Sequence, residues 1–127
     1  MTISTENFHP DTDPKLLCTC GHPNCDKRSI SQEHLNRIQK TRDIVGHPLT
    51  LTSGGRCPYH PEEVHRDTPA DHQKQQGGDV EVNGASRGNV VKAGIKAGCN
   101  AIGVAKTFVH LGYRPELPEG HLTMWVY

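Results

Sequence analysis

The chain has little apolar material, few aromatic residues and no excess of either charge. Apolar residues make up 33% of its 127 positions and aromatic residues 5%, while 14 Lys and Arg balance 14 Asp and Glu. The sequence shows no basic stripe with interleaved aromatic residues, which is the usual footprint of nucleic-acid binding. No apolar run approaches the length that a membrane span needs. We therefore expect no nucleic-acid partner and no membrane span.

The first residues, MTISTENFHPDTDPK, are polar and lack the apolar core of a secretory signal. We therefore expect no signal peptide and a protein that is made in the cytoplasm. If it acts outside that compartment, we expect it to leave by another route, such as cell lysis or assembly into a particle.

A chain of this length suits one compact domain, and its 13 Gly and 9 Pro favour a loop-rich α+β or β domain over a helical bundle. The apolar spacing predicts a helix over residues 29–45, with Ser29 or Ser31 as its N-cap and Gly46 at its end. A second helix is predicted over residues 89–98. Alternating or short apolar stretches predict strands at residues 49–52, 79–82, 101–104, 107–111 and 122–127.

Residues 1–28 are predicted to form an N-terminal arm and a cysteine knuckle, and residues 29–127 to form the main domain. The knuckle, CTCGHPNC, holds Cys18, Cys20 and Cys25, and a fourth cysteine, Cys57, follows Arg56 directly. Four thiolates can close a structural zinc site, and one or two disulfides would form in an oxidising compartment. Because C-x-C is tighter than the usual C-x-x-C zinc pair, the spacing slightly favours disulfides or free thiols over a metal.

Three further residues, His72, Asp79 and His110, are candidate ligands of a single zinc ion. Three protein ligands with a free fourth position are typical of catalytic zinc, which lowers the pKa of a bound water. A polar loop would supply His72, and two neighbouring strands would hold Asp79 and His110 rigidly. Without a metal, the same residues would be a solvated loop histidine, a turn-forming aspartate and a half-buried strand histidine.

Four blocks of the sequence, PLTLTSGGRCPYHPEEV, DHQKQQGGDVEV, IGVAKTFVHLGYRP and MWVY, resemble the peptidase M15 family. Members of this family are zinc D-Ala-D-Ala carboxypeptidases and L-Ala-D-Glu endopeptidases, and the Hedgehog signalling domain shares their fold. They typically read S-G-Y-R-x-P-x-H-N, then S-x-H-x-x-G-x-A-x-D, then F-V-H-x-D, and end in R-W-x-Y. The resemblance covers about residues 30–127 and is strongest to the small, often phage-encoded members, which also tend to carry an N-terminal C-x-C-G knuckle.

The resemblance implies an α+β fold with a small antiparallel sheet and flanking helices, similar to the Hedgehog and DD-peptidase domains. It assigns the zinc to His72, Asp79 and His110, and gives Arg56 the role of binding substrate and polarising the scissile carbonyl. The implied function is a zinc-dependent peptidase that hydrolyses peptidoglycan stem peptides. Such a protein would be a phage endolysin or a virion-associated enzyme, acting at the cell wall, in the periplasm or within a particle beside other virion proteins.

The chain departs from the family pattern at four positions. Ala70 stands for the usual Ser and Gln75 for the usual Gly. Thr107 and Gly112 stand where family members carry the carboxylate that acts as general base. Other candidates for the base are Glu81, Glu116, Glu119 and His121. A catalytically silent, zinc-binding structural component of a phage particle is therefore the alternative function.

Three aromatic residues near the end of the chain are expected either in the core or along a substrate groove. They are Tyr113, Trp125 and Tyr127.

Overall fold

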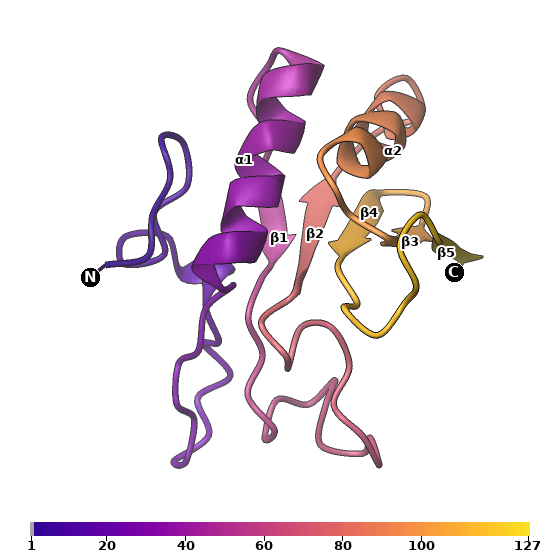
Figure 1. Ribbon diagram of the computed structural model, residues 1–127. Coiled ribbons are helices and arrows are strands. Elements are labelled where there is room, and N and C mark those ends of the chain that lie inside the picture. Colours follow the sequence, from indigo (N-terminus) through magenta and orange to yellow (C-terminus); the bar gives the residue numbers. More distant parts are fainter. Residues whose placement is uncertain (1) are drawn as a thin grey trace.

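A computed structural model describes residues 2–127 and shows a five-stranded sheet with two helices across one face (Figure 1). The helices are α1 (Gln32–Val45) and α2 (Arg87–Lys96), and a 3-10 turn, η1 (Pro14–Leu16), precedes them. The strands are β1 (Leu51–Ser53), β2 (Gly77–Glu81), β3 (Ala101–Val104), β4 (Phe108–Gly112) and β5 (Thr123–Val126). The predicted α+β class with flanking helices is confirmed.

The strands lie in the order β1-β2-β4-β3-β5. Neighbouring strands are antiparallel except for β3 and β5, which are parallel. This edge pair differs from the wholly antiparallel sheet expected from the sequence. It arises because the loop over residues 113–122 carries the chain from the end of β4 across to the far edge of β3.

Helix α1 begins and ends at the predicted capping residues. The Ser31 side chain accepts a hydrogen bond from the backbone N–H of His34. Gly46 ends the helix in a left-handed conformation with φ 85°, which glycine adopts without steric cost. Leu35 and Ile38 are fully buried beneath the helix. The local signals in the sequence therefore placed this element correctly, within a few residues at its start.

The two faces of the sheet differ in character because successive side chains of a strand point to opposite sides. Toward the helices the sheet presents a closely packed apolar layer: Leu51, Val80, Ile102, Val109 and Leu111. Helix α2 comes very close to this layer at Gly94, where an added Cβ would lie 2.5 Å from the Leu111 side chain. The glycine that weakens the helical pattern is thus needed for the packing of the helix on the sheet.

The helix-free face carries a row of residues from four strands at one level. Asp79 of β2 pairs with His110 of β4, His110 pairs with Gly103 of β3, and Gly103 pairs with Trp125 of β5. The Trp125 ring covers Gly103, where a Cβ would lie 2.7 Å from the indole nitrogen. This row forms the floor on which the candidate site is built.

The N-terminal segment packs along α1 and against the turn over residues 53–57. Phe8 and Leu16 are buried in the core, and the Thr5 hydroxyl donates a hydrogen bond to Gln39 of α1. The backbone N–H of Gly55 donates to the carbonyl of Leu16. The division of the chain at residue 28 stays a prediction. Within residues 2–127, no helix combines the length and the apolar character needed to cross a membrane.

Candidate active site

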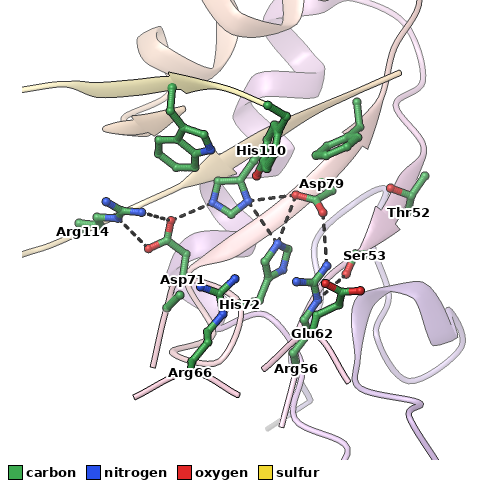
Figure 2. Close-up of a pocket in the computed structure, with 14 residues that line it drawn as sticks. Thr52, Ser53, Arg56, Glu62, Arg66, Asp71, His72, Asp79, His110 and Arg114 are labelled. Carbon is green, nitrogen blue, oxygen red and sulfur yellow. Dashed lines mark hydrogen bonds and ion pairs between the residues drawn. The ribbon is translucent and has the colours of Figure 1, made fainter. Parts of the chain in front are cut away.

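The three predicted zinc ligands meet on the helix-free face of the sheet (Figure 2). His72 comes from the long loop before β2, Asp79 from β2 and His110 from β4. Asp79 Oδ1 lies 3.2 Å from His72 Nε2 and 3.0 Å from His110 Nδ1, and these two nitrogens are 3.2 Å apart. All three side chains are buried. The structure therefore brings together residues that are 31 and 38 positions apart in the sequence.

Each of the two histidines is held by its other ring nitrogen. His72 Nδ1 donates a hydrogen bond to the carbonyl of Gly54 at 2.7 Å, because a carbonyl can only accept. His110 Nε2 lies 2.8 Å from Asp71 Oδ2 and donates to that carboxylate. These bonds leave His72 Nε2 and His110 Nδ1 facing Asp79. Metal-binding histidines are usually oriented in this way, by a carbonyl or carboxylate on the opposite nitrogen.

The electrostatics of the group favour a bound cation. Burial alone would raise the pKa of Asp79, but its side-chain contacts with His110 and His72 outweigh burial and hold that pKa well below its usual range. Burial alone would lower the pKa of His110, whereas its hydrogen bonds to Asp71 and Asp79 raise it. A proton on His110 is thus stabilised between two carboxylates, in a place where a divalent cation would be stabilised more strongly.

The donor atoms fit a tetrahedral zinc ion. Zinc binds nitrogen and carboxylate oxygen at about 2.0–2.1 Å, so its ligand atoms lie roughly 3.3 Å apart. The three distances of 3.0–3.2 Å are close to that value, and the donor set of two imidazoles and one carboxylate is one that zinc prefers. His72, Asp79 and His110 can therefore hold a metal ion, with a fourth position left for a further ligand.

A cavity of about 570 Å³ opens above these residues. Its walls combine cationic and aromatic side chains: Arg56, Arg66, Arg114, Phe108, Trp125 and Tyr127. The ring centroids of Trp125 and His110 are 5.4 Å apart. Of the three aromatic residues considered in the sequence, Trp125 and Tyr127 line this cavity. The third, Tyr113, lies elsewhere, beneath the guanidinium of Arg37.

Arg56 lies at the edge of the three-residue cluster and is held in place from several sides. Its Nη2 is 3.6 Å from Asp79 Oδ2, and its Nη1 pairs with Glu63 at 3.3 Å. Its Nε donates to the Ser53 hydroxyl, and its backbone N–H donates to the carbonyl of His72. The turn that carries Arg56 is therefore tied directly to the loop that carries His72.

Asp71, which was not among the residues predicted from the sequence, contacts both His110 and Arg114. Its Oδ1 accepts a hydrogen bond from Arg114 Nε at 2.9 Å. A Cβ added at Gly112 would lie only 2.5 Å from Asp71 Oδ2 and 2.8 Å from His110 Nε2. The Asp71 carboxylate thus occupies the space over Gly112, the position where the M15 pattern has an acidic side chain. The only sequence feature that could have pointed to Asp71 is its position directly before His72.

The other candidates for the general base lie away from this site. None of Glu81, Glu116, Glu119 and His121 is among the cavity-lining residues in the described part of the chain, and Glu119 and His121 line a separate pocket. The carboxylates that do line the cavity are Glu62, Asp71 and Asp79. Glu62, beside Arg56 in Figure 2, has no ion pair within residues 2–127, whereas the other two are bonded to the histidines.

The four cysteines that the sequence suggested as a second cluster also come together in the structure. The sulfur atoms of Cys18, Cys20, Cys25 and Cys57 all lie within 4.8 Å of one another, and none of these cysteines forms a disulfide.

Comparison with known proteins gives one family match. The sequence profile of a family described as Peptidase M15 matches residues 11–112, which is most of the chain and includes all seven residues of the two clusters and Arg56. No significant similarity to any curated protein or to any solved structure was found.

Proposed function

This chain belongs to the peptidase M15 family, and from the geometry of its site we propose that it is a zinc-dependent peptidase that hydrolyses peptidoglycan stem peptides. One observation carries the proposal: His72 Nε2, Asp79 Oδ1 and His110 Nδ1 converge within 3.0–3.2 Å at the floor of an open cavity. Three ligands beneath an open cavity are the arrangement of a catalytic rather than a structural zinc site.

Each residue of the site has a definite task in this proposal. A zinc ion held there would supply Lewis-acid chemistry, by polarising the scissile carbonyl and making water a better nucleophile. Asp79 and the two histidines provide the ligand atoms. The contacts with Gly54 and Asp71 orient the two imidazole rings so that His72 Nε2 and His110 Nδ1 would face an ion held there.

Arg56 would bind the peptide next to the bond that is cut. A guanidinium offers a fixed fork of donors that suits a carboxylate or the oxyanion that develops on the carbonyl oxygen during attack. Its ion pair with Glu63, which is 1% exposed, holds the side chain in position before substrate arrives. This preorganisation reduces the rearrangement needed at the moment of reaction.

The cavity supports the stem peptide as the substrate class. These short peptides carry free carboxylates, and the cavity wall offers three guanidinium groups, those of Arg56, Arg66 and Arg114. Trp125 and Tyr127 give the same wall an apolar surface against which a peptide side chain can pack. A phage lysis enzyme or a virion-associated wall-opening protein is the role that fits this substrate.

Glu62 is the residue to which we assign the general base. Among the three carboxylates of the cavity it is the one without a histidine partner, so its charge remains available to accept a proton from the attacking water.

The alternative function is a zinc-binding structural component of a phage particle without peptidase activity. A specific observation favours it: both oxygens of Asp71, the carboxylate that lies over Gly112, are already engaged by His110 and Arg114. In that case the fold and the metal would be kept and the chemistry lost.

The two functions are separated by incubating the protein with purified peptidoglycan and identifying released peptides by mass spectrometry. We expect wild type and the control His65→Ala, an exposed histidine of the same loop, to release peptides, and His72→Ala and Glu62→Gln to release none. Zinc content measured on the same samples should fall in His72→Ala and remain unchanged in Glu62→Gln. Zinc binding by wild type without release from any type of wall would favour the structural role instead.

A further inference from the structure

A second set of side chains that could bind a metal ion lies outside the lining of the cavity. It consists of three cysteines of the N-terminal knuckle and one from the turn itself: Cys18, Cys20, Cys25 and Cys57. Their four sulfur atoms lie within 4.8 Å of one another, and those of Cys20 and Cys57 are 3.6 Å apart. We propose that these four cysteines bind a second zinc ion, with a structural role, that joins the N-terminal segment to the turn carrying Arg56.

The distances match a closed tetrathiolate site. Zinc binds thiolate sulfur at about 2.3 Å, so the sulfurs of a tetrahedral site lie roughly 3.8 Å apart. The Cys20–Cys57 separation of 3.6 Å is close to that value, and no pair of the four sulfurs is more than 4.8 Å apart. Two disulfides would instead draw the sulfurs into two separate pairs. A single cluster of four reduced thiols is therefore better explained by one ion at its centre.

The local structure of the knuckle is compatible with zinc binding. Cys18 and Cys20, two residues apart, both place their sulfur atoms in the cluster. Lys27 adopts a left-handed conformation with φ 54°, and its backbone N–H donates a hydrogen bond to Cys25 Sγ at 3.4 Å. Such a bond stabilises a thiolate, the form of cysteine that binds metal. The tight C-x-C spacing, which favoured disulfides in the sequence, is thus compatible with a metal site.

The cluster joins the N-terminal knuckle to the turn that carries Arg56. Cys57 follows Arg56, whose backbone N–H donates to the carbonyl of His72. On the other flank the ring of Tyr59 stacks on that of His22 in the knuckle, with centroids 4.3 Å apart. A side chain at Gly55 would collide with the carbonyl of Arg28, so the two segments are in backbone contact. Coordination of one ion by cysteines from both segments would strengthen this contact and hold the turn that carries Arg56 in place.

Metal stoichiometry and sulfur coordination test this site independently of the active site. We expect two zinc ions per chain in wild type and in Cys99→Ser, a buried cysteine outside the cluster. Cys25→Ser should retain one. His72→Ala should also retain one, and X-ray absorption at the zinc edge should show that ion with sulfur neighbours alone, at about 2.3 Å.

Wild-type protein alone provides a second measurement, which does not depend on the folding of any variant. Purified without reductant, then treated with chelator and denaturant, it should release its zinc and show five titratable thiols. One or three thiols would indicate disulfides and overturn the proposal. So would a single zinc in wild type that is lost entirely in His72→Ala. Failure of the peptidase assay leaves this proposal unaffected, because none of these readouts uses activity.

Discussion

The two candidate ligand clusters of this protein are linked through one turn, where Arg56 contacts the first and Cys57 belongs to the second, and they differ in almost every respect. The cluster of His72, Asp79 and His110 offers three nitrogen and oxygen donors, two of them on adjacent sheet strands, beneath an open cavity. The cysteine cluster offers four sulfur donors, all from loops. Ligand number and access decide what a zinc site can do, since a closed site can only stabilise while an open one can react.

The turn that carries Arg56 and Cys57 explains why one short chain would need both clusters. Arg56 and Cys57 are neighbours, so the residue proposed to bind substrate and a residue of the closed cluster share one stretch of backbone. The sheet fixes Asp79 and His110, but no strand holds Arg56 or His72. A second metal ion would supply the rigidity that secondary structure does not provide there.

Asp79→Asn is expected to have the largest effect on the active-site cluster and none on the cysteine cluster. Loss of the buried negative charge removes the one anionic ligand and leaves two neutral imidazoles, which bind zinc more weakly than the full set of three. Peptide release should fall to the level of a blank, and zinc content should fall by one ion per chain. Asp67→Asn, in the exposed part of the same loop, is the matched control and should retain both. Retention of full activity by Asp79→Asn would refute the ligand assignment.

Arg56→Lys should separate catalysis from metal binding. Lysine retains the charge but loses the fixed fork that reaches Asp79, Glu63 and Ser53. The expected loss in kcat is about 10²–10³-fold, the usual cost of removing one donor to a developing oxyanion. Both zinc ions should remain. Arg66→Lys provides the comparison, and an equal loss in that variant would argue against a special role for Arg56.

Asp71→Asn should weaken zinc binding at the active-site cluster and leave zinc binding at the four cysteines unchanged. The amide can still accept a hydrogen bond from His110, but it lacks the negative charge that strengthens His110 as a ligand. Zinc affinity, measured by competition with a chelator, is expected to fall about 10–100-fold. The ion assigned to the four cysteines serves as the internal reference. Unchanged affinity would mean that Asp71 has no orienting role.

A third buried histidine, which belongs to neither cluster, allows a comparison of stability against pH. Burial lowers the pKa of His34 to about 4, although its hydrogen bond to the Leu111 carbonyl partly opposes the shift. The unfolded chain binds this proton near pH 6.5, so between pH 6.5 and 4 the unfolded state carries more protons and stability falls as pH falls. At pH 5 the cost is about 2 kcal/mol.

The corresponding measurement is the free energy of unfolding from pH 7 to pH 5 in wild type and His34→Gln. Glutamine can donate to the same carbonyl and does not titrate, so the variant should lose about 2 kcal/mol less than wild type over this range. The metal-site histidines are common to both proteins and cancel in the difference. Parallel curves for the two proteins would contradict the assignment of this loss to His34.

The smallest effect is expected at Gln75, which stands where the M15 pattern has glycine. Its φ of 65° shows that the left-handed backbone is kept without the residue that favours it. Gln75→Gly would relieve roughly 1 kcal/mol of strain, and the added flexibility of the unfolded chain would cost about 0.5–1 kcal/mol. Thermal unfolding should therefore shift little in either direction. A strong destabilisation by Gln75→Gly would show that the Gln75 side chain makes a stabilising contact and would contradict a purely backbone effect.

The sequence predicted local structure and the residues that meet at the site more readily than the contacts between them. The ends of α1 follow from Ser31 and Gly46, because capping acts within one turn of chain. The structure brings His72, Asp79 and His110 together as the family pattern implies. The position of Asp71 depends on how the loop folds over Gly112, and no short-range signal encodes that. The same holds for the pairing of Arg56 with Glu63.

The spacing of the cysteines also left their chemistry open for a physical reason. Disulfides and zinc thiolates both need sulfurs that come together, and C-x-C is compatible with each. Only the mutual distances of all four sulfurs distinguish a single cluster from two pairs.

The most direct test of the central claim is anomalous diffraction at the zinc edge from crystals grown with zinc. We expect a peak bounded by His72 Nε2, Asp79 Oδ1 and His110 Nδ1, at about 2.0–2.2 Å from each. A second peak should lie among the four cysteines, and its presence or absence bears only on the structural site. No peak among His72, Asp79 and His110, with those side chains still in hydrogen-bond contact with one another, would contradict the account.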